Sequence, residues 1–151
     1  MPYAEKSYEK YKREFYDIAS SLIDYRHSDF DQKAHDYAMK KVERDMEQGY
    51  QGLEYKFNTV SSSRGDYPFI TITFGLGTDQ FAKMASKIFL RVHREGQGKD
   101  GNKKPVLFPK LVFLYTEDLH GKGNVNEDLF EEGIKTSAKT MYPDWLSLDG
   151  D

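Results

Sequence analysis

The stretch from Val106 to Tyr115 is almost continuously apolar, and it constrains the fold more than any other feature of the chain. Strands that are covered on both faces read in this way, and they belong mostly to parallel sheets. A second strand is predicted from Phe69 to Phe74, where β-branched and aromatic residues follow Pro68. Parallel strands need a crossover connection, which is usually a helix. The sequence therefore predicts an α/β protein.

A helix joins the two predicted strands. Apolar residues recur at helical spacing from Phe81 to Val92, after a turn from Gly75 to Asp79. Strand, helix and strand then form a βαβ unit, whose crossover is right-handed in nearly all known proteins. A last helix is predicted to begin at Asn126 as its N-cap and to run to Met141, where Tyr142-Pro143 ends it.

The N-terminal part of the chain is predicted to be a helical hairpin. Its first apolar stripe consists of Tyr8, Tyr11, Phe15, Ile18 and Leu22. A second stripe runs from Phe30 to Phe57, after a loose capping box of Ser28 and Asp31. Gly49 and Gly52 lie within it and predict either a close helix contact or a kink. The polar stretch Ser61–Asp66 is predicted to end this second helix.

These elements divide the chain into a helical hairpin, residues 1–60, and a βαβ-α portion, residues 61–151, of one incomplete domain. Two parallel strands alone would present long unpaired edges, so further strands must come from elsewhere. The segment Asp144–Asp151 carries a Trp and two Leu without a predicted element. It therefore resembles a cut through a domain.

Composition excludes several classes of function. The 151 residues carry 22 Lys and Arg against 25 Asp and Glu, and the net charge of −3 argues against binding of a nucleic-acid polymer or an anionic membrane. No apolar run approaches the roughly 18–20 residues of a membrane span, and the N-terminus lacks the pattern of a secretion signal, so a cytoplasmic protein is expected. Without cysteine, the chain has no thiolate metal site, catalytic thiol or radical-carrying thiol.

Two polar segments beside the predicted strands are candidates for binding. The segment Gly75–Thr78 lies between strand and helix, where glycines let a backbone approach a phosphate and the helix offers free N–H groups. The third glycine of a dinucleotide fingerprint and the lysine of a P-loop are missing, so on the motif alone a plain turn is favoured. Asn58-Thr59 and Ser61–Arg64 gather hydrogen-bonding groups before the first strand, where a plain loop is again favoured.

Pro109-Lys110 and the histidines are further candidates. Proline inside the apolar strand predicts either a bulge that turns Lys110 toward an anion or an edge strand. His27 and His35 flank Asp31 at spacings of four, but surface polar residues explain this pattern better than a metal site. No carboxylate partner can be named for the other two histidines, His93 and His120. No metal ligand is therefore predicted.

Five segments in order along the chain resemble the catalytic subunit of the anaerobic (class III) ribonucleoside-triphosphate reductases, members of the glycyl-radical superfamily. They are Gln51–Val60, Ser62–Phe69, Thr73–Thr78, Pro105–Phe113 and Ser137–Asp144. The resemblance implies a ten-stranded α/β barrel of two parallel five-stranded halves, which reduces ribonucleoside triphosphates for deoxyribonucleotide synthesis. This chain would be an internal fragment of that barrel, and the hairpin agrees with the family's arrangement in type.

The resemblance also implies partners and cofactors. Such enzymes use a thiyl radical on a finger-loop cysteine, and a glycyl radical installed by an iron-sulfur activase generates it. The chain contains neither the cysteines nor the glycyl-radical region, so we expect it to be inactive alone, with no cofactor or catalytic residue of its own. Its expected partners are a ribonucleoside triphosphate and the remaining segments of the reductase, and a second copy of the chain is a further candidate.

In the family, loops at the carboxyl ends of the barrel strands face the substrate. The resemblance thus implies that the nucleotide pocket is lined or supported by Asn58, Thr59, Ser62, Arg64, Thr73, Gly75, Gly77, Thr78 and Lys110. The Asn-Thr and Gly-Thr segments would hydrogen-bond phosphate or ribose, and Ser62 and Arg64 would order a loop. The alternative is a free-standing α/β module in which Gly75–Thr78 holds a phosphate and the hairpin binds a partner.

Overall fold

The computed structural model describes residues 2–20, 30–64, 70–98, 101, 103–104, 106 and 108–150, without the side chains of residues 20 and 60–64. The chain clusters into two compact units, Met1–Met46 and Glu47–Asp151. The predicted division at residue 60 stays a prediction. None of the described helices is long and apolar enough to cross a membrane.

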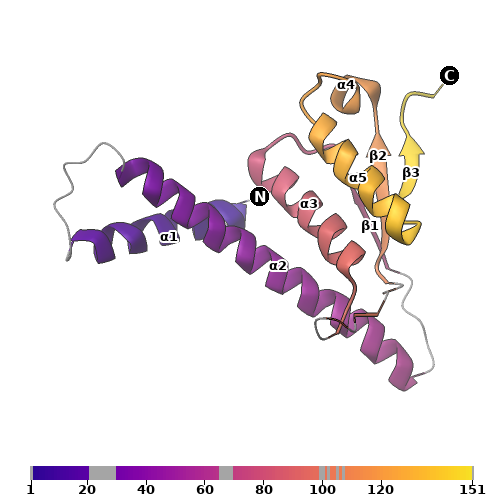
Figure 1. Cartoon of the computed structure of the whole chain (residues 1–151), viewed down its shortest axis with the longest axis horizontal. Helices are drawn as coiled ribbons and strands as arrows, with labels where there is room; N and C mark the ends of the chain where they lie inside the picture. The colour runs from indigo at the N-terminus through magenta and orange to yellow at the C-terminus, as the bar shows by residue number, and fades with distance from the viewer. Residues whose placement is uncertain are drawn as a thin grey trace. The chain divides into compact units, whose positions relative to one another are not determined.

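The first unit pairs helix α1, Pro2–Ser20, with the beginning of helix α2, Phe30–Arg64 (Figure 1). The ring of Phe15 packs against those of Phe30 and Tyr37, with centroids 5.9 and 5.5 Å away. Both predicted helices are present. Ile18, which the apolar stripe predicts to be buried, is 51% exposed. The predicted end of the first helix near Tyr25 and the cap at Ser28 lie outside the described residues.

Helix α2 extends to Arg64 and so ends inside the polar stretch Ser61–Asp66 that is predicted to end it. Serine lowers helix stability by only a fraction of a kcal/mol relative to alanine, so three serines in a row do not end a helix by themselves. A Cβ atom at Gly49 or Gly52 would meet nothing within 4 Å in the described part of the chain. The close helix contact predicted at these glycines is therefore not found there.

The second unit contains a three-stranded parallel sheet in the order β1-β2-β3. Its strands are β1, Thr71–Phe74; β2, Lys110–Tyr115; and β3, Asp144–Ser147. Thr71 pairs with Lys110, and Val112 pairs with Asp144, so the apolar strand β2 is central. The predicted parallel βαβ unit is confirmed, with both strands shorter than predicted.

Strand β3 lies in the segment for which the sequence predicts no element. Four residues are too few for a periodic signal, and the strand is held instead by pairing with β2. Trp145 packs against Phe113 of β2, with ring centroids 4.7 Å apart, and against Phe130 at 5.5 Å. Trp145, for which the sequence predicts no element, is thus part of the folded unit.

Helices α3, Gln80–Glu95, and α5, Glu127–Thr140, lie side by side over one face of the sheet, and the short helix α4, Glu117–His120, follows β2 (Figure 1). The core lies between these layers and consists of Phe74, Leu90, Leu111, Phe113 and Leu129. Val112 and Leu114 point to the opposite face and are half-buried. The described residues thus do not bury both faces of β2 as the sequence predicts.

Candidate functional site

The loop Gly75–Thr78 joins the carboxyl end of β1 to the beginning of α3. Gly75 is buried, whereas Thr73, Gly77 and Thr78 are exposed. In open parallel sheets, ligands bind outside the carboxyl ends of the strands. Four of the nine predicted site residues therefore lie together at the edge where such a sheet binds its ligand.

Steric contacts explain why both Gly75 and Gly77 are glycines. Gly75 has a φ of +119°, and a Cβ atom there would lie 2.8 Å from the carbonyl oxygen of Leu114. A Cβ atom at Gly77 would lie 2.7 Å from the Cβ atom of Ala82, in the first turn of α3. Only glycine fits these positions without strain. The loop therefore passes close to both β2 and α3.

Asp79 caps the helix that follows the loop. Its carboxylate accepts a hydrogen bond from the Ala82 N–H at 3.3 Å, and its carbonyl accepts one from the Lys83 N–H at 2.9 Å. A negative charge already stands at the N-terminus of α3, where an anion would otherwise be favoured. The N–H group of Ala82, at the start of this helix, is therefore already satisfied within the chain.

Two buried side chains hold the loop from inside the protein. The Nε2 atom of His120 lies 2.8 Å from the carbonyl oxygen of Gly75. The Nδ2 group of Asn126 donates to the same oxygen at 3.2 Å and to the carbonyl oxygen of Gly77 at 3.1 Å. His120 is 1% exposed and Asn126 is fully buried. The loop is thus fixed at two of its carbonyl groups.

Sequence reasoning missed both of these roles. Asn126 immediately precedes α5 as predicted, but its side chain makes no capping hydrogen bond. His120 received no role because its partner Gly75 lies 45 residues away in the sequence. Neither residue stands in a spacing that points to the loop, so no local signal could have found them.

Asn58, Thr59 and Lys110 lie at the opposite end of the sheet. The Nδ2 group of Asn58 donates to the carbonyl oxygen of Phe108 at 2.7 Å, just before β2 begins. The hydroxyl group of Thr59 donates to a carbonyl of its own helix at 2.6 Å. Lys110 is the first residue of β2 and pairs with the first residue of β1. The structure therefore does not bring the Asn-Thr and Gly-Thr segments together.

Lys110 is placed differently from both sequence expectations. Pro109 precedes β2, so the strand has no bulge at this point, and β2 is a central strand rather than an edge strand. The Nζ atom of Lys110 lies 3.8 Å from Oδ2 of Asp144, and both side chains are about half exposed. Such a surface ion pair contributes little to stability. Ser62 and Arg64 lie in α2, and their side chains lie outside the described part of the structure.

A buried acid-base pair, which sequence reasoning also missed, joins α2 to α3. The Nδ1 atom of His93 lies 3.9 Å from Oε1 of Glu54, and the two side chains are 1% and 0% exposed. Burial raises the pKa of the Glu54 carboxyl group to about 7 and lowers the pKa of His93 to about 4. The ring of Tyr142 lies edge-on to the imidazole, with ring centroids 5.4 Å apart.

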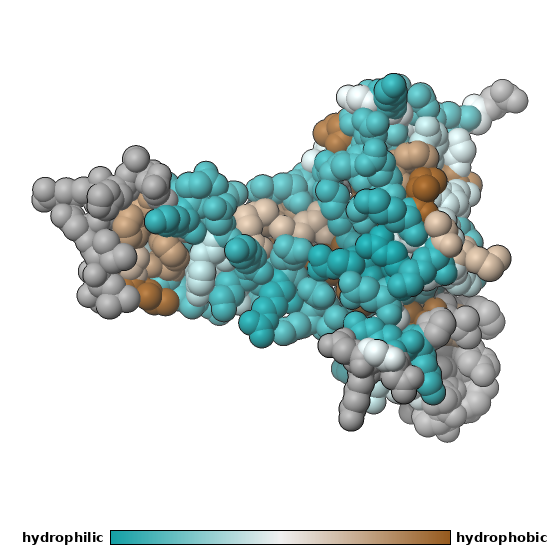
Figure 2. Space-filling model, viewed as in Figure 1, coloured by the Kyte–Doolittle hydropathy of each residue, from teal (hydrophilic) through white to brown (hydrophobic). Residues whose placement is uncertain are grey.

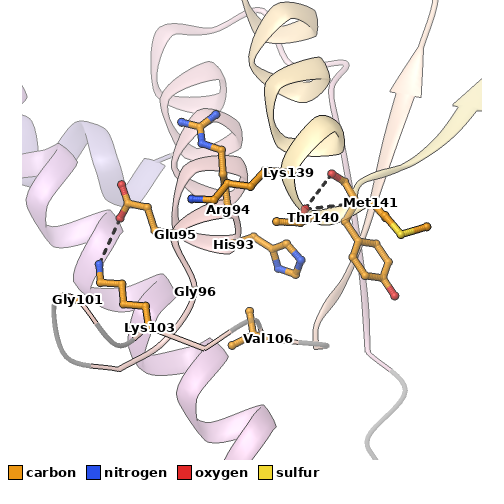
Figure 3. Close-up of a pocket in the computed structure, with 11 residues that line it drawn as sticks. His93, Arg94, Glu95, Gly96, Gly101, Lys103, Val106, Lys139, Thr140 and Met141 are labelled. Atoms are coloured by element: carbon orange, nitrogen blue, oxygen red, sulfur yellow. Dashed lines mark hydrogen bonds and ion pairs between the residues drawn. The ribbon is translucent and has the colours of Figure 1, made fainter.

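A pocket of about 680 Å³ opens beside His93, where the C-terminal ends of α3 and α5 come together (Figure 3). Its cationic lining residues are Arg94, Lys103 and Lys139. Arg94 bonds to Glu132 at 3.2 Å. Arg94 and Lys139 lie in the last turns of α3 and α5, where a cation complements the negative end of the helix dipole. The pocket lies at the amino end of the sheet and contains none of the predicted site residues.

The described residues include no group of three or more His, Asp or Glu side chains that could hold a metal ion. Asp31 and His35, from the histidine pattern in the sequence, bond to tyrosines instead. Tyr16 donates to Asp31, and the hydroxyl oxygen of Tyr8 lies 2.6 Å from Nδ1 of His35. His27 lies outside the described residues.

Comparisons with known proteins agree with one another. The family described as anaerobic ribonucleoside-triphosphate reductase matches residues 2–150. The anaerobic ribonucleoside-triphosphate reductase of Enterobacteria phage T4 is 36% identical over 149 residues, which are 97% of this chain and 22% of that protein. The protein of the same name from Escherichia coli strain K12 is 38% identical over 117 residues, 77% of this chain and 16% of that protein. This chain therefore spans about a fifth of the length of these relatives.

Proposed function

The chain belongs to the anaerobic ribonucleoside-triphosphate reductase family, and from this membership we propose that it forms a segment of the catalytic barrel of such a reductase. The match over residues 2–150 carries the proposal. A parallel sheet with its helices on one face is also the kind of unit from which α/β barrels are built. The reaction would be the reduction of ribonucleoside triphosphates to their deoxy forms.

The ten-stranded barrel would take three of its strands from this chain. Among the described residues, β1 and β3 each pair along one edge only. Their outer edges would pair with strands from the remaining segments of the reductase, which we propose as the partners of this chain. Closure in this way removes the exposed edges of a sheet.

The radical chemistry would be performed by other segments. The chain has no cysteine, so a thiyl radical cannot form on it. The glycyl radical and the iron-sulfur activase that installs it would also come from outside this chain. Its own residues would bind and orient the nucleotide.

The loop Gly75–Thr78, with Thr73 beside it, would hydrogen-bond phosphate or ribose oxygens of the nucleotide. Its position at the carboxyl end of β1 supports this role, because loops at that edge face the ligand in parallel α/β folds. Three further predicted residues lie at the amino end of the sheet, namely Asn58, Thr59 and Lys110. They would support the pocket indirectly, by stabilising the fold through contacts such as those of Asn58 with Phe108 and of Lys110 with Asp144. Ser62 and Arg64 stay candidates for loop ordering.

Hydrogen exchange tests this assignment directly. We would add a ribonucleoside triphosphate to the complex of this chain with the remaining reductase segments and follow the backbone amides. Exchange should slow at residues 75–78 and stay unchanged at residues 58, 59 and 110, which serve as the internal control. Protection at the amino end without protection at the loop would contradict the proposal.

The alternative is a free-standing nucleotide-binding or phosphate-binding module. The complete core between the sheet, α3 and α5 favours it, because these elements bury their apolar residues against one another within one unit. The isolated chain decides between the two functions. A dilute monomer that binds a nucleotide by itself at residues 75–78 would favour the module over the reductase segment.

A further inference from the structure

The carbonyl groups of the Gly75–Thr78 loop determine where its N–H groups point. The structure describes cis peptide bonds only before Pro109 and Pro143, so the peptide bonds of the loop are trans. In a trans peptide unit, the C=O group and the N–H group of the next residue point in opposite directions. The Gly75 carbonyl faces His120 and Asn126, so the Leu76 N–H points away from them.

The same argument applies one peptide unit further along the loop. The carbonyl of Gly77 faces Asn126, so the N–H group of Thr78 also points outward. No described group accepts a hydrogen bond from the N–H of Leu76 or Thr78, and both residues are exposed. The loop therefore presents two free backbone donors, two residues apart, at the carboxyl edge of the sheet.

His120 is built to hold this arrangement. The Gly75 carbonyl oxygen can only accept a hydrogen bond, so Nε2 of His120 carries a proton and donates it to that oxygen, while Nδ1 lies 3.1 Å from both the N–H group and the carbonyl oxygen of Thr116. Its ring lies edge-on against Phe113 at 4.9 Å and stacks on Tyr115 at 5.5 Å. The contact with Gly75 thus requires a proton on Nε2, and two aromatic rings orient the imidazole.

Among the described residues, the side chain of Asn126 hydrogen-bonds only to the loop. Its Nδ2 group makes both of its hydrogen bonds to loop carbonyls, whereas its buried Oδ1 atom has no hydrogen-bond partner among the described residues. A buried polar atom without a partner costs free energy. The two hydrogen bonds from Nδ2 keep both loop carbonyls turned inward, although they leave Oδ1 in a position without a partner among the described residues.

We propose that His120 and Asn126 are positioning residues of the nucleotide site, which turn the N–H groups of Leu76 and Thr78 toward an oxygen atom of a ribonucleoside triphosphate. This inference rests on the proposed function of the loop. It deepens that function, because it assigns the contact to two backbone donors and their orientation to two side chains that do not touch the nucleotide.

Two substitutions at one position separate positioning from simple folding. His120→Gln carries an amide nitrogen at about the reach of Nε2 and keeps the bond to Gly75. His120→Asn reaches only about as far as Nδ1, so it keeps the bond to Thr116 and loses the bond to Gly75. Each variant would be joined to the remaining reductase segments, with the loop amides followed by NMR and ATP as the probe.

We expect His120→Asn to shift the amide signals of Leu76 and Thr78 before ATP is added, and to weaken ATP binding about tenfold, the effect of one lost hydrogen bond. His120→Gln should restore both the signals and the affinity. If His120→Asn does not fold, Asn126→Ser, which withdraws the other donor, replaces it with the same two expectations.

The outcomes distinguish this inference from the proposed function. If ATP leaves the Leu76 and Thr78 amides of the unmodified complex unchanged, the proposed function fails and the inference fails with it. If ATP shifts those amides but the variant that loses its donor binds ATP as tightly as the unmodified complex, only the inference is overturned.

Discussion

At the scale of single residues, the burial of Glu54 and the burial of His93 change the pH dependence of stability in opposite directions. The pKa of Glu54 rises from 4.5 to about 7 on folding, so the folded state holds the extra proton and the contribution of Glu54 to stability falls as the pH rises through this range. The pKa of His93 falls from 6.5 to about 4, so the unfolded state holds the extra proton and the contribution of His93 rises with pH. Between pH 4.5 and 6.5 the two effects cancel.

Removing either partner should therefore reveal the effect of the other. With Glu54→Gln, we expect the free energy of unfolding to rise by about 2 kcal/mol from pH 4.5 to 6.5, and with His93→Gln to fall by about as much. Urea unfolding at pH 4.5, 5.5 and 6.5 measures both, with the unmodified chain as the reference for all other titrating groups. Parallel pH profiles of the two variants would show that the groups are not buried as a pair.

The same residues show what sequence can and cannot reveal. The turn at Gly75–Asp79 and the helix after it follow from local spacing, and both are found. The partners of His93, His120 and Asn126 do not follow from local spacing. Glu54, the partner of His93, lies on a separate helix. Gly75 lies 45 residues from His120 and 51 residues from Asn126. These contacts depend on which strands and helices pack together.

At the scale of elements, the sequence predicts the long periodic segments well, but it does not predict the short strand β3. Helix α3 and the central strand β2 carry clear patterns and lie where the sequence places them. Strand β3 has only four residues and takes its conformation from pairing with β2, so tertiary contacts decide it. The polar stretch Ser61–Asp66 is predicted to end the second helix, and α2 ends within it at Arg64, after three serines that stay helical.

Two glycine substitutions test the difference between a turn and a helix. Gly75→Ala should lower the free energy of unfolding by about 1–3 kcal/mol, because φ is positive and the new Cβ atom would meet the Leu114 carbonyl oxygen at 2.8 Å. Gly52→Ala should raise it by about 0.5–1 kcal/mol, because a Cβ atom at this position in α2 would meet no described atom within 4 Å. Chemical denaturation of both variants checks the signs, and a stabilising Gly75→Ala would contradict the described loop.

At the scale of the whole molecule, the described strands of the second unit leave two sheet edges unpaired, and apolar side chains are exposed at its surface. Figure 2 shows hydrophobic residues at the surface above α5 and β3. The large exposed ones there are Ile134, Met141, Trp145, Leu146 and Leu148. Unpaired strand edges beside apolar side chains favour pairing with further strands. The surface and the edge therefore suit contact with the remaining segments of a barrel.

Co-expression with separately encoded flanking segments of a full-length reductase should therefore raise the solubility of the chain. It should also slow amide exchange most at β1 and β3, whose outer edges would become paired, and least at β2, which is already central. Exchange of the isolated chain as a dilute monomer gives the baseline. Full protection of β1 and β3 in that monomer would mean that the sheet needs no further strands.

The most direct test of the central claim, that this chain is a working segment of an anaerobic reductase, is reconstitution of turnover. Deoxynucleotide formation from a ribonucleoside triphosphate would be measured with activase and reductant, for the chain alone, for the remaining segments alone and for both together. The account predicts product only from the combined segments, because the chain has no cysteine and the other segments lack its strands. Turnover by the chain alone, or equal turnover with and without it, would contradict the account.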